Sequence, residues 1–258
     1  MYKIFSIAKY TFVSNFRNRI FWVLILFGLL LLASSVLFGL LGQEQEIRML
    51  VDLGLAAIEI LSFLVAVFLM VNLILEEMES KTIYLVLTRA ISKIEYLLGK
   101  FLGALTSLSV CLIIMTLAHF LLLYLKGWKF QEEGLLYLLT IFMSFEKLLL
   151  ISALALFFSL FSSSGLTAMV FSFFFWTLGH FAMELKFLSN EIQNQFSKWL
   201  IKGIYFLIPH FQYLNARDLW IAVSDRLSSF VIEGSLYTLF YSSFLLALSF
   251  AIFRKKEF

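Results

Sequence analysis

The residues of this chain that could do chemistry are few, and their spacing argues against catalysis. The sequence contains no Gly-x-x-x-x-Gly-Lys-Ser/Thr motif, so it cannot hold the phosphates of ATP by that device. His119, His180 and His210 have no second ligand at the spacing of a metal site. The serines at 162–164 have no neighbouring base and are better interpreted as a tight turn. We therefore predict no catalytic residue, metal or cofactor in this chain.

Ionisable or polar side chains inside apolar runs form a second group. Glu59 and Asn72 lie in one run, and Glu146 and Lys147 lie in another. A charge at the bilayer centre costs about 2.5–3.5 kcal/mol on insertion scales, and consecutive residues of a helix do not face each other. In one interpretation these charges line a translocation path or a dimer seam, with Lys147 pairing with Glu59. In the other, the span begins near Leu148, and Glu146 and Lys147 lie among the outer headgroups.

A third group is the charged segment 76–100, which lies between two apolar runs. Eight of its 25 residues are charged, about twice the frequency in the whole chain. Apolar residues recur within it at helical spacing, at positions 83, 87, 91, 94 and 98. The pattern suits a docking element, and it fits equally well a solvated hairpin that packs on the span ends.

Membrane-spanning helices must position these groups. Of the 258 residues, 62% are hydrophobic and 14% are charged, whereas a soluble domain has about 45–50% apolar and about 25% charged residues. Thirty-one Phe and one Pro favour long helices, and a membrane barrel would alternate apolar and polar residues instead. The composition excludes a soluble domain and predicts an all-α polytopic membrane protein with a single domain, 1–258.

We predict six transmembrane helices, because a helix needs about 20 apolar residues to cross a bilayer core. Five uninterrupted runs are long enough, and a sixth, 135–161, contains Glu146 and Lys147. The five are residues 20–41, 53–75, 101–125, 166–183 and 230–253. The stretch 199–211 is too short to cross, so we assign a re-entrant or interfacial helix pair to the external loop 184–229.

The distribution of Lys and Arg gives the orientation. Six spans put both termini on one side, which carries eleven of these residues. The opposite side carries three in its short loops and eight in all. Because Lys and Arg concentrate in cytoplasmic loops, we expect both termini to face the cytoplasm.

Residues 1–19 are predicted to form an amphipathic helix in the cytoplasmic interface, with its cations toward anionic headgroups. At 100° per residue, Met1, Ile4, Phe5, Ala8, Phe12 and Phe16 fall within an arc of about 120°, opposite Lys3, Ser6, Tyr10, Ser14 and Arg17. A frayed positive tail that only orients the first span is the alternative.

The run 79–100 resembles the segment after the second span of type-2 ABC transporter permeases. That family's pattern is a Glu, then Gly- or Lys-Thr, an apolar pair, Pro-Ile-Ser-Arg, an acidic residue and Leu-Gly-Lys. The matching residues here are Lys81-Thr82, Ile91-Ser92, Glu95 and Leu98-Gly99-Lys100. Two positions depart: Ala90 replaces the usual Pro and lets a helix continue, and Lys93 replaces Arg and loses its bidentate geometry.

The resemblance covers nearly the whole chain, although only residues 79–100 are specific. The interfacial first helix, the six spans, the turn at 159–164 and the long external loop with Pro209 all suit the family. It implies a coupling helix that sits in a groove of a cytoplasmic ATPase. It also implies that the first helix and the external loop correspond to the family's interface helix and re-entrant helices.

The resemblance implies the membrane subunit of a bacterial ABC exporter in the cytoplasmic membrane. We expect a second permease subunit, identical or related, and an ATPase dimer that holds ATP and Mg. ATP closure would move the coupling helices and rock the spans to release substrate outward. The implied ATPase-coupling residues are Glu76, Glu79, Thr88, Arg89, Ala90, Ile91, Ser92, Lys93, Glu95 and Lys100.

The substrate leaves no clear mark on the sequence, although a largely apolar path suits a lipid-like molecule. The alternative function is an accessory or scaffolding membrane protein whose cytoplasmic loop docks a partner other than an ATPase. A neighbouring gene for a Walker-A ATPase without membrane spans would favour the exporter.

Overall fold

The computed structural model describes residues 2–39, 45–80, 91–162, 164–192, 194–217 and 227–255, and within these ranges the chain is helical without strands. The helices are α1 (Tyr2–Arg17), α2 (Arg19–Gly39), α3 (Glu46–Glu79), α5 (Lys93–Leu125), α6 (Phe130–Phe161), α7 (Gly165–His180), α8 (Ala182–Glu191), α9 (Gln195–Leu207), the 3-10 helix η2 (Phe211–Leu214) and α10 (Leu227–Lys255). The prediction of an all-α membrane protein is confirmed.

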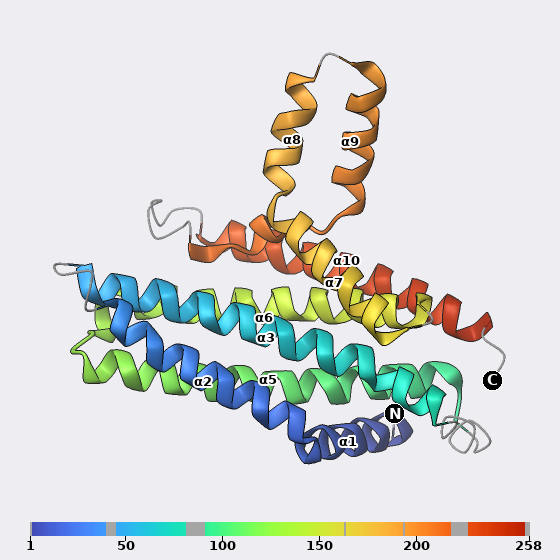
Figure 1. Cartoon of the computed structure of the whole chain (residues 1–258), viewed down its shortest axis with the longest axis horizontal. Helices are drawn as coiled ribbons and strands as arrows, with labels where there is room; N and C mark the ends of the chain where they lie inside the picture. Colours follow the sequence, from blue (N-terminus) through green and yellow to red (C-terminus); the bar gives the residue numbers. More distant parts are fainter. Residues whose placement is uncertain are drawn as a thin grey trace.

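Long helices lie side by side, with both termini toward one end of the bundle (Figure 1). Among the described residues, α2, α3, α5, α6 and α10 are long and apolar enough to cross a membrane, and a sixth span results if α7 and α8 are counted together. The helices α8 and α9 form a hairpin that projects sideways from the bundle (Figure 1).

The predicted span over 166–183 is bent, because α7 ends at His180 and α8 continues at an angle of 63°. The Gln212 side-chain amide donates to the His180 carbonyl at 3.1 Å, an oxygen that a continuous helix would have used itself. One residue earlier, Gly179 lies so close to the Pro209 carbonyl that a Cβ would come within 2.5 Å of its oxygen. Contacts with the segment around η2 therefore accompany the bend.

The core of the bundle lies between α3 and α6. In their most apolar segments 78% and 72% of the residues are buried, against 28% in α2 and in α10. The fully buried side chains include Phe63 and Met70 of α3 and Leu150 of α6. Apolar side chains on the outer helices remain exposed, as expected where a helix faces lipid.

The spanning helices extend beyond their predicted ends. The helix α3 begins at Glu46, seven residues before the predicted start at 53, and its 34 residues measure about 51 Å at 1.5 Å per residue. An ion pair between Lys126 Nζ and Glu46 Oε1 (2.6 Å) joins this extension to the end of α5. Much of the predicted connector 42–52 is therefore helix.

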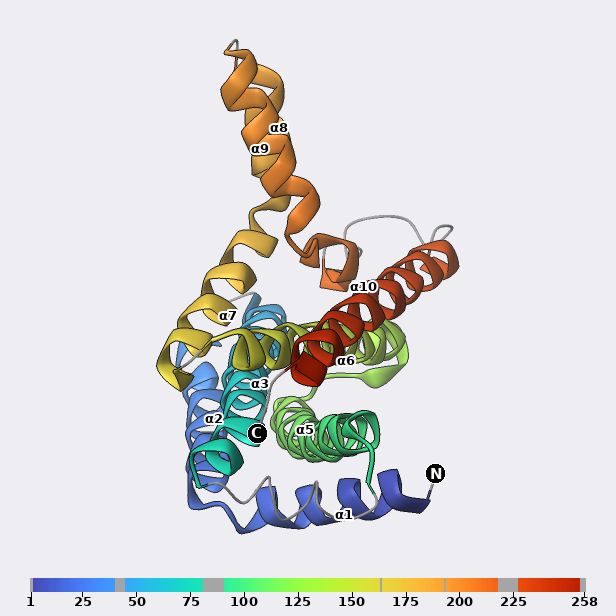
Figure 2. The same ribbon diagram turned by 90° about the vertical axis from the view of Figure 1, so that its right-hand side faces the viewer.

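The helix α1 lies across the bundle, packed on α5, as expected for an interface helix (Figure 2). Two glycines of α5, Gly99 and Gly103, allow this close approach: a Cβ on Gly103 would lie 2.5 Å from the Ala8 carbonyl and 2.6 Å from the Thr11 Cβ. Small residues four apart commonly let membrane helices meet at the backbone.

This packing rotates α1 relative to the predicted apolar face. Thr11, which was not part of that face, is the residue buried in α1, whereas Phe5 is 70% exposed. Gly99 faces the Ile7 side chain, and Gly103 faces Thr11 and the main chain of Ala8. A part of the predicted apolar face is thus left open to lipid.

We predict that Gly103→Ala lowers the free energy of unfolding by about 1–3 kcal/mol, because the new Cβ meets a main-chain oxygen that cannot move aside. The matched control is Gly203→Ala on α9, where a Cβ meets nothing within 4 Å and alanine favours a helix by up to about 1 kcal/mol. Denaturant unfolding in detergent measures both. Equal effects of the two changes would contradict the close α1–α5 contact.

Candidate functional site

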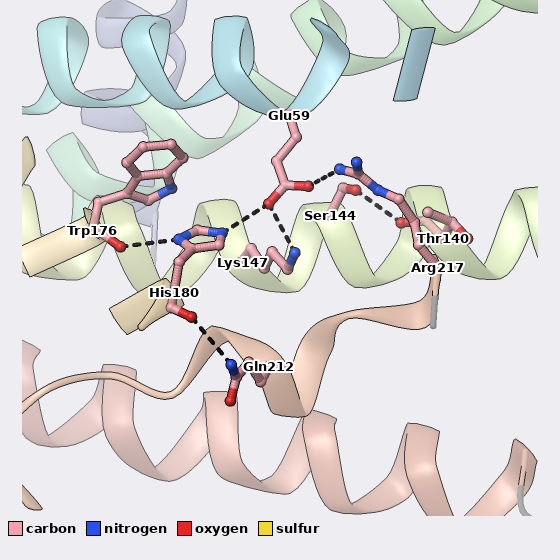
Figure 3. Close-up of polar contacts among 8 residues, drawn as sticks. All are labelled: Glu59, Thr140, Ser144, Lys147, Trp176, His180, Gln212 and Arg217. Atoms are coloured by element: carbon pink, nitrogen blue, oxygen red, sulfur yellow. Dashed lines mark hydrogen bonds and ion pairs between the residues drawn. The ribbon is translucent and has the colours of Figure 1, made fainter. Parts of the chain in front are cut away.

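A buried carboxylate, Glu59 of α3, is shared by three nitrogen-bearing side chains (Figure 3). Its Oε1 atom accepts from Lys147 Nζ of α6 at 2.8 Å and lies 3.3 Å from His180 Nε2 at the end of α7. Its Oε2 atom pairs with the guanidinium of Arg217, in the segment that follows η2. We call these four residues the Glu59 cluster; they bring together three helices and a loop.

The structure places Glu146 and Lys147 inside the protein. The helix α6 runs without a break from Phe130 to Phe161 and so passes through both residues; the start of the membrane span near Leu148 stays a prediction. Lys147 is 4% exposed and makes the ion pair with Glu59 that the sequence suggested. Glu146 lies near Thr238 of α10, and its Oε2 atom makes no hydrogen bond with any residue that the structure describes. The consecutive residues Glu146 and Lys147 therefore face different parts of the protein.

Hydrogen bonds orient His180 within the Glu59 cluster. Its Nδ1 atom lies 2.9 Å from the Trp176 carbonyl, and its Nε2 atom faces the Glu59 carboxylate (Figure 3). Both ring nitrogens of His180 therefore face acceptor oxygens. Arg217, which also contacts Glu59, comes from the loop 184–229. Nothing in the sequence linked His180 or Arg217 to Glu59.

A cavity of about 540 Å³ opens beside the Glu59 cluster. Its lining combines these charged side chains with polar and apolar ones: Ala56, Glu59, Ile60, Lys147, Trp176, His180, Met183, Phe211, Gln212, Asn215 and Arg217. Its volume is that of a small-molecule site, where a few polar groups orient a ligand within a mostly apolar wall.

A second polar cluster lies where α3 ends and α5 begins. Glu77 of α3 accepts from the Tyr96 hydroxyl with one carboxylate oxygen and pairs with Lys100 of α5 through the other. The Lys100 ammonium also lies 5.8 Å from the ring centre of Tyr10 on α1. We call Glu77, Tyr96 and Lys100 the Glu77 cluster. It joins the two helices that flank the charged segment.

The predicted coupling residues near the Glu77 cluster lie in different environments. Glu76 and Asn72 line a small cavity of about 70 Å³ that Lys100 and Glu77 share. Lys100 itself is buried. Ile91 packs at the edge of the hydrophobic core. Glu77, which the sequence did not single out, carries the ion pair instead of Glu76.

Two motif residues begin α5. The Ser92 hydroxyl accepts from the Glu95 main-chain N–H at 3.2 Å, and the Glu95 carboxylate accepts from the Ser92 N–H at 2.9 Å. This reciprocal capping box fixes the first turn of a helix. Lys93 donates to the Arg254 carbonyl at the end of α10 at 3.2 Å. Thr88, Arg89, Ala90 and the side chain of Glu79 lie outside the described residues.

We predict that Glu59→Gln destabilises the protein by about 3 kcal/mol and Lys147→Met by about 1 kcal/mol. Removing the carboxylate leaves buried cations without their counter-charge, whereas removing Lys147 leaves Glu59 with Arg217 and His180. The control is Glu46→Gln, which breaks the partly exposed pair with Lys126 and should cost less than about 1 kcal/mol. Unfolding in detergent measures all three, and a Lys147→Met variant that loses more than Glu59→Gln would contradict a shared carboxylate.

The sequence of this helical bundle is similar to a known family of membrane proteins. The chain matches the family model described as ABC-2 family transporter protein over residues 5–258. A search of curated proteins found no match. The family match includes α1, the spanning helices, the Glu59 cluster and the Glu77 cluster. This chain therefore belongs to the ABC-2 transporter family, the multi-pass membrane permeases that associate with an ABC ATPase.

Proposed function

We propose that this permease is the membrane subunit of a bacterial exporter, and that its segment 76–100 docks on a cytoplasmic ATPase. The observation that carries the proposal is the junction between α3 and α5. The undescribed residues 81–90 connect two long helices whose ends are held together by the Glu77 cluster. Family membership favours this function over a scaffold that docks another kind of protein.

The junction suits the transmission of movement from an ATPase. A displacement applied at 81–90 reaches α3 and α5 together, because Lys100 and Tyr96 both bind Glu77. The capping box at Ser92 holds the start of α5, and Lys93 contacts the end of α10. Rigid helices and packed side chains carry coupling between distant sites. Three helices would therefore respond to one docking event.

The same end of the bundle suits the cytoplasmic side. Both termini lie toward it (Figure 1), and α1 lies across the bundle with exposed residues that include Phe5 and Lys9. An amphipathic helix with basic residues favours an anionic lipid surface. A permease of this kind acts with a second copy or a related chain, and ATP with Mg binds in the ATPase dimer.

We predict that Arg89→Glu combined with Lys93→Glu lowers co-purification with the ATPase at least tenfold, because both cations belong to the proposed dock. The matched control is Lys9→Glu, which reverses an exposed charge on α1 at the same end of the bundle and should leave the complex intact. The complex and its ATP turnover are measured together. Unchanged values for the double variant would contradict the proposed dock.

The direction of transport has its own test. In inside-out membrane vesicles, an exporter moves its substrate into the lumen when ATP is added outside. Accumulation of a candidate amphiphile in the lumen would support export, and ATP-dependent loss from preloaded vesicles would contradict it.

A further inference from the structure

We propose that the cavity at the Glu59 cluster is a headgroup site for an anionic amphiphile whose apolar tail lies in the adjacent groove between α2, α3 and α7. The headgroup is a phosphate, whose oxygens suit the fork of N–H donors of an arginine. This inference deepens the proposed function, since it names the substrate class of the exporter.

The charges of the described lining residues favour an anion. Glu59 carries their single carboxylate, whereas Lys147 and Arg217 carry two permanent positive charges, and His180 presents a further nitrogen. Excess charge is costly in an apolar bundle unless a counter-charge accompanies it. An anionic headgroup in the cavity supplies that counter-charge.

Arg217 is the residue best placed to receive the headgroup. Its side chain is 26% exposed, whereas that of Lys147 is 5% exposed, so Arg217 is the more accessible of the two cations that line the cavity. A guanidinium has five N–H donors in a planar fork that suits phosphate and carboxylate oxygens. Glu59 then acts as an internal counter-ion: it holds the arginine in place, and Lys147 continues to neutralise the carboxylate when the headgroup binds.

An apolar groove of about 400 Å³ lies next to this cavity and shares the helices α3 and α7 with it. Its lining is formed by Ile20, Leu24, Phe63, Leu64, Val67, Phe68, Met169, Val170 and Phe173, without a charged residue. Residues of this kind accept an acyl tail and offer nothing to a headgroup. The two hollows therefore differ in chemistry in the way that the two ends of an amphiphile differ.

One stacked pair of aromatic rings joins the two hollows. Trp176 lines the cavity, Phe63 lines the groove, and their ring centres are 4.4 Å apart. Along α3, Val67 lies eight residues after Glu59, which is about 12 Å at 1.5 Å per residue. The headgroup would lie toward the start of α3 and the tail toward its end. With the termini in the cytoplasm, this is the orientation of a lipid in the outer leaflet.

The experiment uses the full-length chain in phosphatidylcholine nanodiscs, without ATPase. The probe is an alkyl phosphate with a photoactivatable diazirine in its tail, and the competitors are an unlabelled alkyl phosphate, the phosphocholine with the same tail, and inorganic phosphate. We expect saturable labelling of groove residues such as Leu64 and Val67, and strong competition by the alkyl phosphate alone. Equal competition by the phosphocholine overturns the anionic headgroup, and equal competition by inorganic phosphate overturns the role of the tail.

Two variants test the two ends separately. Arg217→Gln should weaken alkyl phosphate binding about tenfold, because it removes a charge-assisted contact, whereas Lys202→Gln, which removes an exposed charge on α9, should leave binding unchanged. Leu64→Trp narrows the groove from a position that is 38% exposed, so folding should be retained while binding of the tailed probe falls. Unchanged binding by both site variants, or labelling outside α2, α3 and α7, overturns the proposal.

This binding assay needs neither ATP nor an ATPase partner. Failure to bind the alkyl phosphate would therefore remove the substrate class and leave the dock at Arg89 and Lys93 to be judged by co-purification. Failure of the dock would leave a measured amphiphile site in place.

Discussion

The arrangement of the Glu59 region depends on one physical constraint, which is that a carboxylate 8% exposed in an apolar bundle must be paired. Glu59 meets this constraint with partners from α6, from the end of α7 and from the loop after η2. Three separate segments must therefore converge on α3. The end of α7 at His180 fits the same requirement, since a helix that continued straight would not present His180 and Gln212 to each other.

The helical class and most of the spans are predictable because they depend on local composition: a run of about 20 apolar residues can satisfy its main chain in a bilayer only as a helix. The pair between Glu59 and Lys147 is predictable for a related reason, since each charge lies in an apolar run and needs a partner. The bend after His180 is not predictable in this way, because the residues that contact the chain there, Gln212 and Pro209, lie some 30 residues away in sequence.

Contacts within this chain explain several residues of the motif that carries the family resemblance. Ser92 and Glu95 cap α5, Gly99 admits α1, and Lys100 pairs with Glu77. These positions fix where α5 begins and what packs against it. They were predictable as a motif, but their roles depend on α1 and α3, which the motif does not contain. Partner recognition, on the proposed function, then rests mainly on residues 81–90.

A single helix connects the two clusters. Glu59 and Glu77 are 18 residues apart on α3, which is continuous from Glu46 to Glu79. Eighteen residues at 3.6 per turn make about five turns, so both carboxylates lie on the same face, about 27 Å apart. Lys100 holds one of them to α5, and Lys147 holds the other to α6. On the proposed function, a movement of α3 that begins at the docked ATPase would strain the ion pairs of Glu59, so the charge beside the proposed headgroup cavity would also respond to ATP.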